Sequence, residues 1–145
     1  MNASNIFKLV IIFTISSISN AQKIKPADVK NVMQKVADWQ ITHYQDLYSD
    51  EKKPHHPLDW TNGALYVGMV KWAAMADNDT YYDWLKDIGK KNEWKLNNRK
   101  YHADDHTVGQ LYVDLYRKYD DENMINPLIE QFNFIMLHPA KTSLH

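Results

Sequence analysis

The sequence predicts an all-α protein built from helical hairpins, and three observations lead to this prediction. Glycine is scarce, with four residues in 145, and β-branched runs are few, which favours helices over strands. Apolar residues recur at helical spacing in five successive segments. Two of these segments share a sequence motif, which indicates stacked hairpins.

The first predicted helix begins at Pro26, because proline is tolerated in the first turn of a helix. Its apolar residues form one stripe, and we expect it to stop before the charged segment 50–54. The second helix begins near Asp59 and runs to residue 76. Lys71 is its only charged residue after position 60, so we expect this helix to be buried on several sides.

The third predicted helix covers residues 81–91, and residues 77–80 supply its N-terminal cap. Its apolar and charged residues interleave, which is typical of an outer, half-solvated helix. Asp104 and Asp105 are expected to open the fourth helix, which runs to Tyr119.

The fifth predicted helix follows the acidic turn 120–122, takes Pro127 early and is ended by Pro139. Five helices make two and a half hairpins. A helix as apolar as 61–76 needs more neighbours than these helices supply.

An internal repeat is the most informative feature of this organisation. Residues 59–67 and 105–113 agree at six of nine positions, with a constant offset of 46. Both copies begin with aspartate, contain Thr-x-Gly and end in Leu-Tyr-Val. We interpret each copy as the start of the inner helix of a hairpin. Chance similarity between two amphipathic helices is the alternative.

Three helical glycines, Gly63, Gly68 and Gly109, each cost about 1 kcal/mol relative to alanine. Such costs indicate a compensating contact. We therefore expect close approach between helices, or between a helix end and a ligand, at all three positions.

The N-terminal segment, residues 1–21, has the pattern of a secretory signal. Lys8 supplies a positive charge, an apolar run too short to span a bilayer follows, and small residues lead to Ala21. A buried N-terminal helix is the alternative, but the run is not amphipathic. The sequence predicts a mature domain of residues 22–145 that is secreted or periplasmic and not membrane-bound.

The composition excludes several chemistries and partners. The chain has no cysteine, so disulfides, thiolate catalysis and thiolate metal sites are excluded. A net charge of −1 gives no reason to expect a nucleic acid or an anionic membrane as partner. No cofactor is predicted.

Asp104 and Asp105 are the candidate catalytic residues. Adjacent carboxylates at a helix N-terminus can hold different protonation states, because repulsion raises one pKa while the helix dipole stabilises the other anion. Such a pair suits acid–base catalysis. The alternative is that Asp104 is an N-cap and Asp105 only stabilises the helix dipole.

His102, Asp104 and His106 also allow a metal-site interpretation. His102 is expected to precede the helix, so the two histidines need not share a face as the ligands of a helical zinc site do. We therefore predict no metal and treat His102 and His106 as candidate substrate-binding residues.

Aromatic residues beside these groups are candidates for stacking on the apolar faces of sugar rings, although a buried core is the usual place for such side chains. Trp60 is the strongest candidate because it lies at a helix start beside Asp59. The others are Tyr66, Tyr101 and Tyr112.

Residues 60–68 and 101–112 together resemble the N-terminal part of the unsaturated rhamnogalacturonyl and glucuronyl hydrolases, glycoside hydrolase families 105 and 88. The resemblance covers residues 27–140. It implies that the helices are the N-terminal part, about five helices, of an (α/α)6 barrel of six hairpins.

The resemblance also implies a reaction that differs from ordinary glycosidic displacement. An aspartate protonates the C4=C5 double bond of a 4,5-unsaturated uronic acid left by a polysaccharide lyase. Water adds at C5, and the resulting hemiketal opens to release the sugar. The implied partner is an unsaturated uronic-acid oligosaccharide, such as a pectin fragment.

By the same resemblance, Asp105 matches the acid on the second inner helix that assists at the uronate and water, with Asp104 as its neighbour. The resemblance also implies that Trp60 and His102 line the pocket. We predict Tyr101 and His106 as further substrate-binding residues. The principal proton donor of the family opens the third inner helix, and the sequence ends before that segment.

We therefore expect a partial domain that is inactive alone. Two alternatives stay open at this point. One is a non-catalytic helical-repeat interaction protein, and the other is a different (α/α)6 carbohydrate enzyme, such as a lyase or epimerase.

Overall fold

The computed structural model describes residues 24–44 and 55–141, and every regular element in these ranges is helical. The all-α class predicted from the sequence is confirmed. The elements are α1 (Pro26–His43), α3 (Trp60–Ala76), α4 (Asp79–Lys91), the 3₁₀ helix η1 (Ala103–His106), α5 (Gly109–Tyr119), the 3₁₀ helix η2 (Glu122–Met124) and α6 (Asn126–Leu137).

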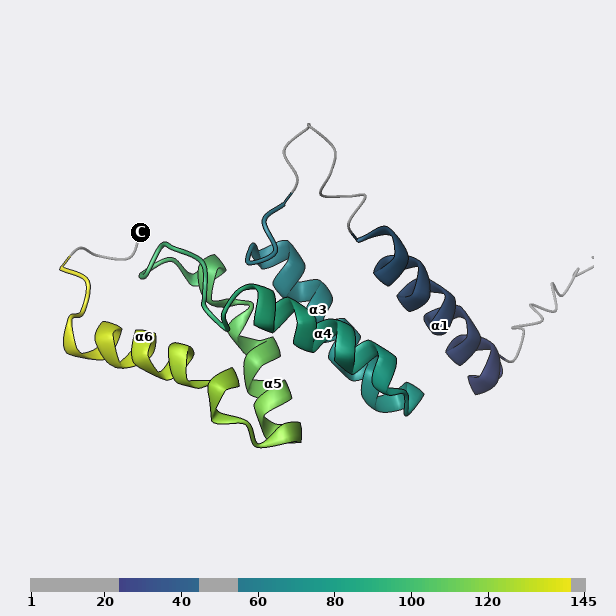
Figure 1. Cartoon of the computed structure of the whole chain (residues 1–145). Helices are drawn as coiled ribbons and strands as arrows, with labels where there is room; N and C mark the ends of the chain where they lie inside the picture. The colour runs from purple at the N-terminus through teal and green to yellow at the C-terminus, as the bar shows by residue number, and fades with distance from the viewer. Residues whose placement is uncertain (1–23, 45–54, 142–145) are drawn as a thin grey trace, which may run out of the picture.

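The helices follow one another as a row, with α1 at one end and α6 at the other (Figure 1). α3 lies in the middle and packs against α1, α4 and α5. The prediction that this helix is buried on several sides is confirmed by these contacts. Further along the row, η2 connects α5 to α6 and packs against both.

Most predicted helix boundaries are confirmed. α3 ends at Ala76, where Asp77 adopts left-handed backbone geometry. The side chain of Asn78 caps α4 by accepting a hydrogen bond from the backbone N–H of Thr80 at 2.9 Å. α6 carries Pro127 in its first turn and ends two residues before Pro139.

The predicted start of the fourth helix is wrong. Asp104 and Asp105 lie in η1, and the α-helix begins only at Gly109. The backbone carbonyl of Asp105 accepts a hydrogen bond from Asn97 at 3.4 Å. This carbonyl is therefore engaged by the preceding loop, and the regular ladder of α5 starts later.

The internal repeat is visible in the core. Tyr66 of α3 and Tyr112 of α5 occupy equivalent positions, and both are fully buried. Each hydroxyl donates to a backbone carbonyl of the loop before its helix, Tyr66 to Pro57 at 2.9 Å and Tyr112 to Lys95 at 3.0 Å. Burial raises the pKa of Tyr112 above its ordinary value. These tyrosines are core residues, so their candidacy as sugar-stacking residues is wrong.

The stripe predicted for the first helix is present, but most of it is exposed. α1 contributes Ala37 to the core. Its large apolar side chains remain open to solvent among the described residues, namely Val29, Val32, Met33, Val36 and Trp39.

Two of the three glycine predictions are confirmed. A Cβ on Gly63 would lie 2.8 Å from Thr107 Oγ1, and one on Gly109 would lie 3.0 Å from a methyl of Leu128. The prediction for Gly68 is wrong, because a Cβ there meets nothing within 4 Å.

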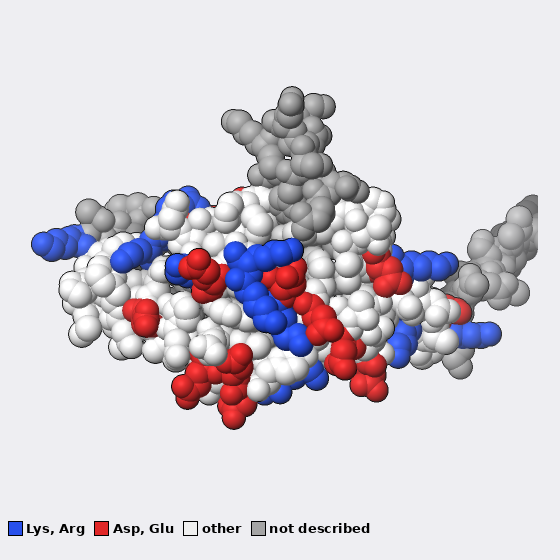
Figure 2. Space-filling model, in the orientation of Figure 1, with Lys and Arg blue, Asp and Glu red and all other residues white. Residues whose placement is uncertain are grey.

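Two sequence predictions, the secretory signal 1–21 and the charged loop 50–54, lie outside the described residues and stay predictions. In the described part of the chain, no helix combines the length and apolarity needed to cross a bilayer. Positive and negative side chains are interspersed on the face shown in Figure 2. On α4, ion pairs such as Lys86–Asp83 at 2.8 Å and Lys91–Asp87 at 2.7 Å join such neighbours.

Two helical glycines allow a matched stability test. A Cβ on Gly89 would overlap the buried ring of Trp94, so Gly89→Ala should lower the free energy of unfolding by about 1–3 kcal/mol. Gly68→Ala removes backbone freedom without a clash and should raise it by up to about 1 kcal/mol. Urea denaturation followed by circular dichroism measures both, and equal effects in the two variants would contradict the packing at Gly89.

Candidate functional site

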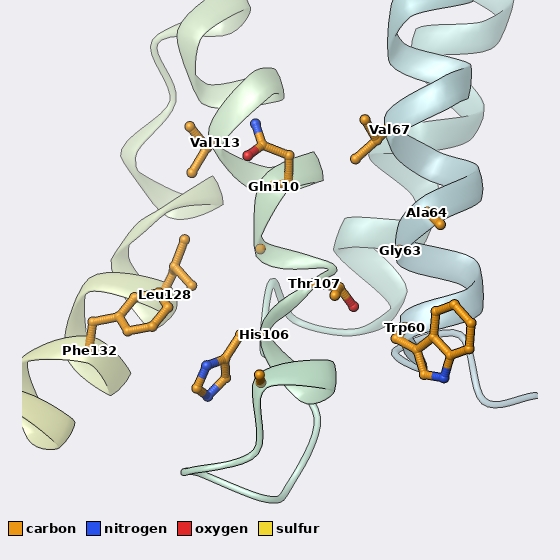
Figure 3. A pocket seen from close by; sticks show the side chains of 12 residues that line it. Trp60, Gly63, Ala64, Val67, His106, Thr107, Gln110, Val113, Leu128 and Phe132 are labelled. Atoms are coloured by element: carbon orange, nitrogen blue, oxygen red, sulfur yellow. The ribbon is translucent and has the colours of Figure 1, made fainter. Parts of the chain in front are cut away.

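An open groove of about 540 Å³ lies between the start of α3, η1, α5 and α6. Its wall is mostly apolar. Figure 3 shows the lining side chains, which come from all four elements. The lining residues are Trp60, Gly63, Ala64, Val67, Ala103, His106, Thr107, Gly109, Gln110, Val113, Leu128 and Phe132.

Eight of these twelve residues form four pairs with the offset of the internal repeat. The pairs are Trp60 with His106, Gly63 with Gly109, Ala64 with Gln110, and Val67 with Val113. Each pair places equivalent positions of the two motif copies on the groove. The groove is therefore the shared inner surface of the two repeats, and the repeat determines which residues reach it.

Trp60 and His106 stand at the same end of the groove, on opposite walls (Figure 3). Trp60 is 54% exposed, so its ring is open to a ligand. The ring of His106 contacts Phe132 edge to face, with centroids 5.3 Å apart, and its Nε2 lies 2.8 Å from the backbone carbonyl of Lys100. Both residues were predicted as substrate-binding, and both line the groove.

Asp105 does not line the groove. Only 1% of this residue is exposed, and its carboxylate is held by the loop that connects α4 to α5. The backbone N–H of Arg99 donates to it at 2.8 Å, and Arg99 Nε lies 3.1 Å from both carboxylate oxygens. Hydrogen bonding to the Arg99 guanidinium lowers the pKa of Asp105 below its ordinary range, against the opposing effect of burial.

Asp105 therefore anchors the α4–α5 loop as an anion. A general acid must hold a proton at the working pH, and the contacts of Asp105 favour the opposite state. Its predicted catalytic role remains a prediction, and the geometry of the described residues supports a structural role.

The other predicted residues surround η1 without lining the groove. Asp104 is exposed, and His102 lies beside both aspartates, with Nδ1 3.8 Å from Asp104 Oδ2 and 4.0 Å from Asp105 Oδ1. Tyr101 donates its hydroxyl hydrogen to the backbone carbonyl of His138. This contact ties the loop to the end of α6.

The metal-site interpretation receives no geometric support in the described ranges. They contain no group of three or more histidine, aspartate or glutamate side chains placed to hold a metal ion. The ring of His106 contacts Phe132 and the Lys100 carbonyl.

Sequence reasoning missed the contribution of α6 to the groove. Leu128 and Phe132 close one wall, and their spacing of four residues placed them on one face of the fifth helix. That face was identifiable from the sequence, but the elements that it packs against were not, because helical periodicity carries no information about tertiary neighbours.

The fold and groove define a class: an α-helical repeat protein with a mostly apolar groove between the inner helices. The family model of Glycosyl Hydrolase Family 88 matches residues 32–144. The chain therefore belongs to glycosyl hydrolase family 88, a family of glycosidases, and its all-α fold is consistent with the N-terminal portion of an α/α barrel.

Two curated relatives carry the name unsaturated 3S-rhamnoglycuronyl hydrolase. The protein from Alteromonas sp. strain LOR is 26% identical over 121 residues, which cover 80% of this chain and 29% of the relative. The protein from Formosa agariphila is 29% identical over 94 residues, which cover 64% of this chain and 23% of the relative. The matched regions thus span less than a third of the length of either relative.

The anchoring role of Asp105 predicts a pH-dependent stability difference. Asp105→Asn should lower the free energy of unfolding by about 1–2 kcal/mol at neutral pH, because a charge-assisted contact is lost while half-exposed Arg99 stays hydrated. The folded pKa of Asp105 is depressed. The difference should therefore be full above about pH 4, the ordinary pKa of aspartate, and vanish as the pH falls through the lower folded value.

Urea denaturation at a series of pH values measures this difference. Asp104→Asn is the matched control, since it changes the neighbouring exposed acid and should alter stability by less than about 0.5 kcal/mol at any pH. A pH-independent effect of Asp105→Asn would refute the ion-pair explanation.

Proposed function

We propose that the chain is the sugar-binding N-terminal part of a hydrolase that removes 4,5-unsaturated uronic acids from lyase-generated oligosaccharides. The observation that carries this proposal is the groove, in which equivalent positions of the two motif copies present Trp60 and His106. Membership of glycosyl hydrolase family 88 supports a carbohydrate substrate. The names of the two curated relatives support an unsaturated uronyl sugar.

The groove chemistry suits such a ring. An aromatic face can pack on the apolar C–H face of a sugar, and a ring that contains a C4=C5 double bond is flattened, which favours this contact. Trp60 offers an exposed face on one wall, and Phe132 offers a second aromatic side chain on the opposite wall. Gln110 is placed to form hydrogen bonds with sugar hydroxyls.

The proposed reaction consumes one water molecule. A proton is added at C4, and the water oxygen bonds to C5 as the water loses one proton, which gives a hemiketal. The hemiketal opens when the new C5 hydroxyl loses its proton and the bond from C5 to the ring oxygen breaks, so that C5 becomes a ketone and the ring oxygen takes a proton. The resulting hemiacetal at C1 becomes an aldehyde and releases the linked sugar, whose oxygen takes a proton. The lining residues include no carboxylate, and Asp105 is buried against Arg99, which favours its anion. We therefore expect the 145-residue chain to bind sugar without hydrolysing it.

A titration with a disaccharide that carries an unsaturated uronic acid linked to rhamnose tests the proposal. Trp60→Ala should weaken binding by roughly 1–2 kcal/mol, about five- to thirty-fold, because the stacking surface is lost. Trp39→Ala is the matched control, since Trp39 is similarly exposed at 52% but lies on α1, outside the groove. Isothermal titration calorimetry measures both affinities.

Four outcomes would count against parts of this proposal. Absence of binding, or equal losses in both tryptophan variants, would contradict sugar recognition in the groove and favour the interaction-protein alternative. Equal affinity for the saturated disaccharide would contradict recognition of the double bond. Release of free sugar by the 145-residue chain would contradict the expectation of binding without turnover.

A further inference from the structure

One residue of the α4–α5 loop contacts both copies of the repeated motif. Asn97 Nδ2 donates to Asp59 Oδ1 at 3.1 Å. The backbone N–H of Asn97 also donates to the backbone carbonyl of Asp105 at 3.4 Å. Because Asp59 and Asp105 are the first residues of the two copies, Asn97 bridges equivalent points of successive hairpins.

The local structure holds Asn97 in this orientation. Its side-chain oxygen accepts a hydrogen bond from the backbone N–H of Asn98 at 2.9 Å, which leaves Nδ2 directed at Asp59. Two positions along, Arg99 fixes the loop to the Asp105 carboxylate. The other carboxylate oxygen of Asp59 accepts from the backbone N–H of His56 at 2.8 Å. Both ends of the bridge are therefore anchored.

The bridge lies next to the two rings at the mouth of the groove. Trp60 directly follows Asp59, and His106 directly follows Asp105. We propose that Asn97 is a positioning residue that fixes Trp60 relative to His106 and so sets the width of the groove at this end. The consequence for sugar binding rests on the function proposed above, whereas the bridge itself does not.

The packing between the two copies makes their relative position sensitive to this bridge. Gly63 lies so close to Thr107 that an added Cβ would come within 2.8 Å of Thr107 Oγ1. Both residues line the groove. A small displacement of one copy is therefore transmitted to the groove wall, because closely packed surfaces do not absorb it.

Amide hydrogen exchange tests the bridge without a ligand. The amides of Gly63 and Thr107 donate to the backbone carbonyls of Asp59 and Asp104, so they report the first turn of each copy. Asn97→Ala should speed exchange at both amides by about five-fold, the factor expected for one lost hydrogen bond. The matched control is Asn98→Ala, because no side-chain hydrogen bond of exposed Asn98 is present among the described residues.

An exchanged pair tests whether the hydrogen bond itself is responsible. The double variant Asp59→Asn/Asn97→Asp reverses donor and acceptor and can keep the contacts with the backbone N–H groups of His56 and Asn98. We expect it to restore slow exchange at both amides. Exchange rates in Asn97→Ala that equal those in Asn98→Ala, or failure of the exchanged pair to restore protection, would overturn the proposal.

Sugar affinity distinguishes a positioning role of Asn97 from a purely structural one, because a purely structural role would leave the affinity unchanged. Asn97→Ala should weaken binding of the unsaturated uronyl-rhamnose disaccharide by about five-fold, and the exchanged pair should recover it, while Asn98→Ala leaves it unchanged. Loss of amide protection with unchanged affinity would overturn the positioning role. If the unaltered chain binds no sugar, the proposed function fails, and the exchange data still decide whether the bridge exists.

Discussion

The burial of α3 is the constraint on which the rest of the described structure depends. This helix has no extended polar face, and its buried residues include Tyr66, Met69 and Trp72. Each large apolar side chain removed from water adds about 1.5–3 kcal/mol to the free energy of unfolding. The fold is therefore stabilised most by helices that cover a large part of the apolar surface of α3. α1, α4 and α5 supply that cover, and the connecting loops follow the positions of these helices.

The groove forms where equivalent positions of the two motif copies meet. Equivalent residues of α3 and α5 face the core, as Tyr66 and Tyr112 do, and other equivalent residues face the groove. Both copies are α-helical from Gly63 to Val67 and from Gly109 to Val113. Residues four positions apart lie on one face of a helix, so these glycine and valine positions reach the groove in both copies. Trp60 opens α3, whereas His106 lies in η1. The place of His106 on the groove therefore depends on the segment before α5.

Most of the fold could be predicted from sequence features that act within a few residues. The hydrogen-bond and ion-pair partners of individual side chains could not be predicted in this way. Apolar periodicity, the Asn78 cap and the prolines around α6 act within a few residues, and the boundaries that they indicate are confirmed. The ion pair between Arg99 and Asp105 lies in a loop without periodicity. Glu93 and Trp94, which precede that loop, adopt left-handed backbone geometry, and non-glycine residues rarely do so. The path of the loop backbone therefore could not be predicted from the amino-acid composition.

The same reasoning applies to the acidic position of the motif, whose side-chain partners were not predicted from the sequence. Adjacent carboxylates before a helix suggest acid–base chemistry, but protonation of a double bond requires an acid whose environment favours the protonated form. The cation and backbone N–H around Asp105 favour the anion instead. In the equivalent position, Asp59 also accepts hydrogen bonds from a backbone N–H and from Asn97. The aspartate of each copy therefore fixes a loop, and the residue after it meets the groove, so the chemistry of the groove can change at that second position while the hairpin stays intact.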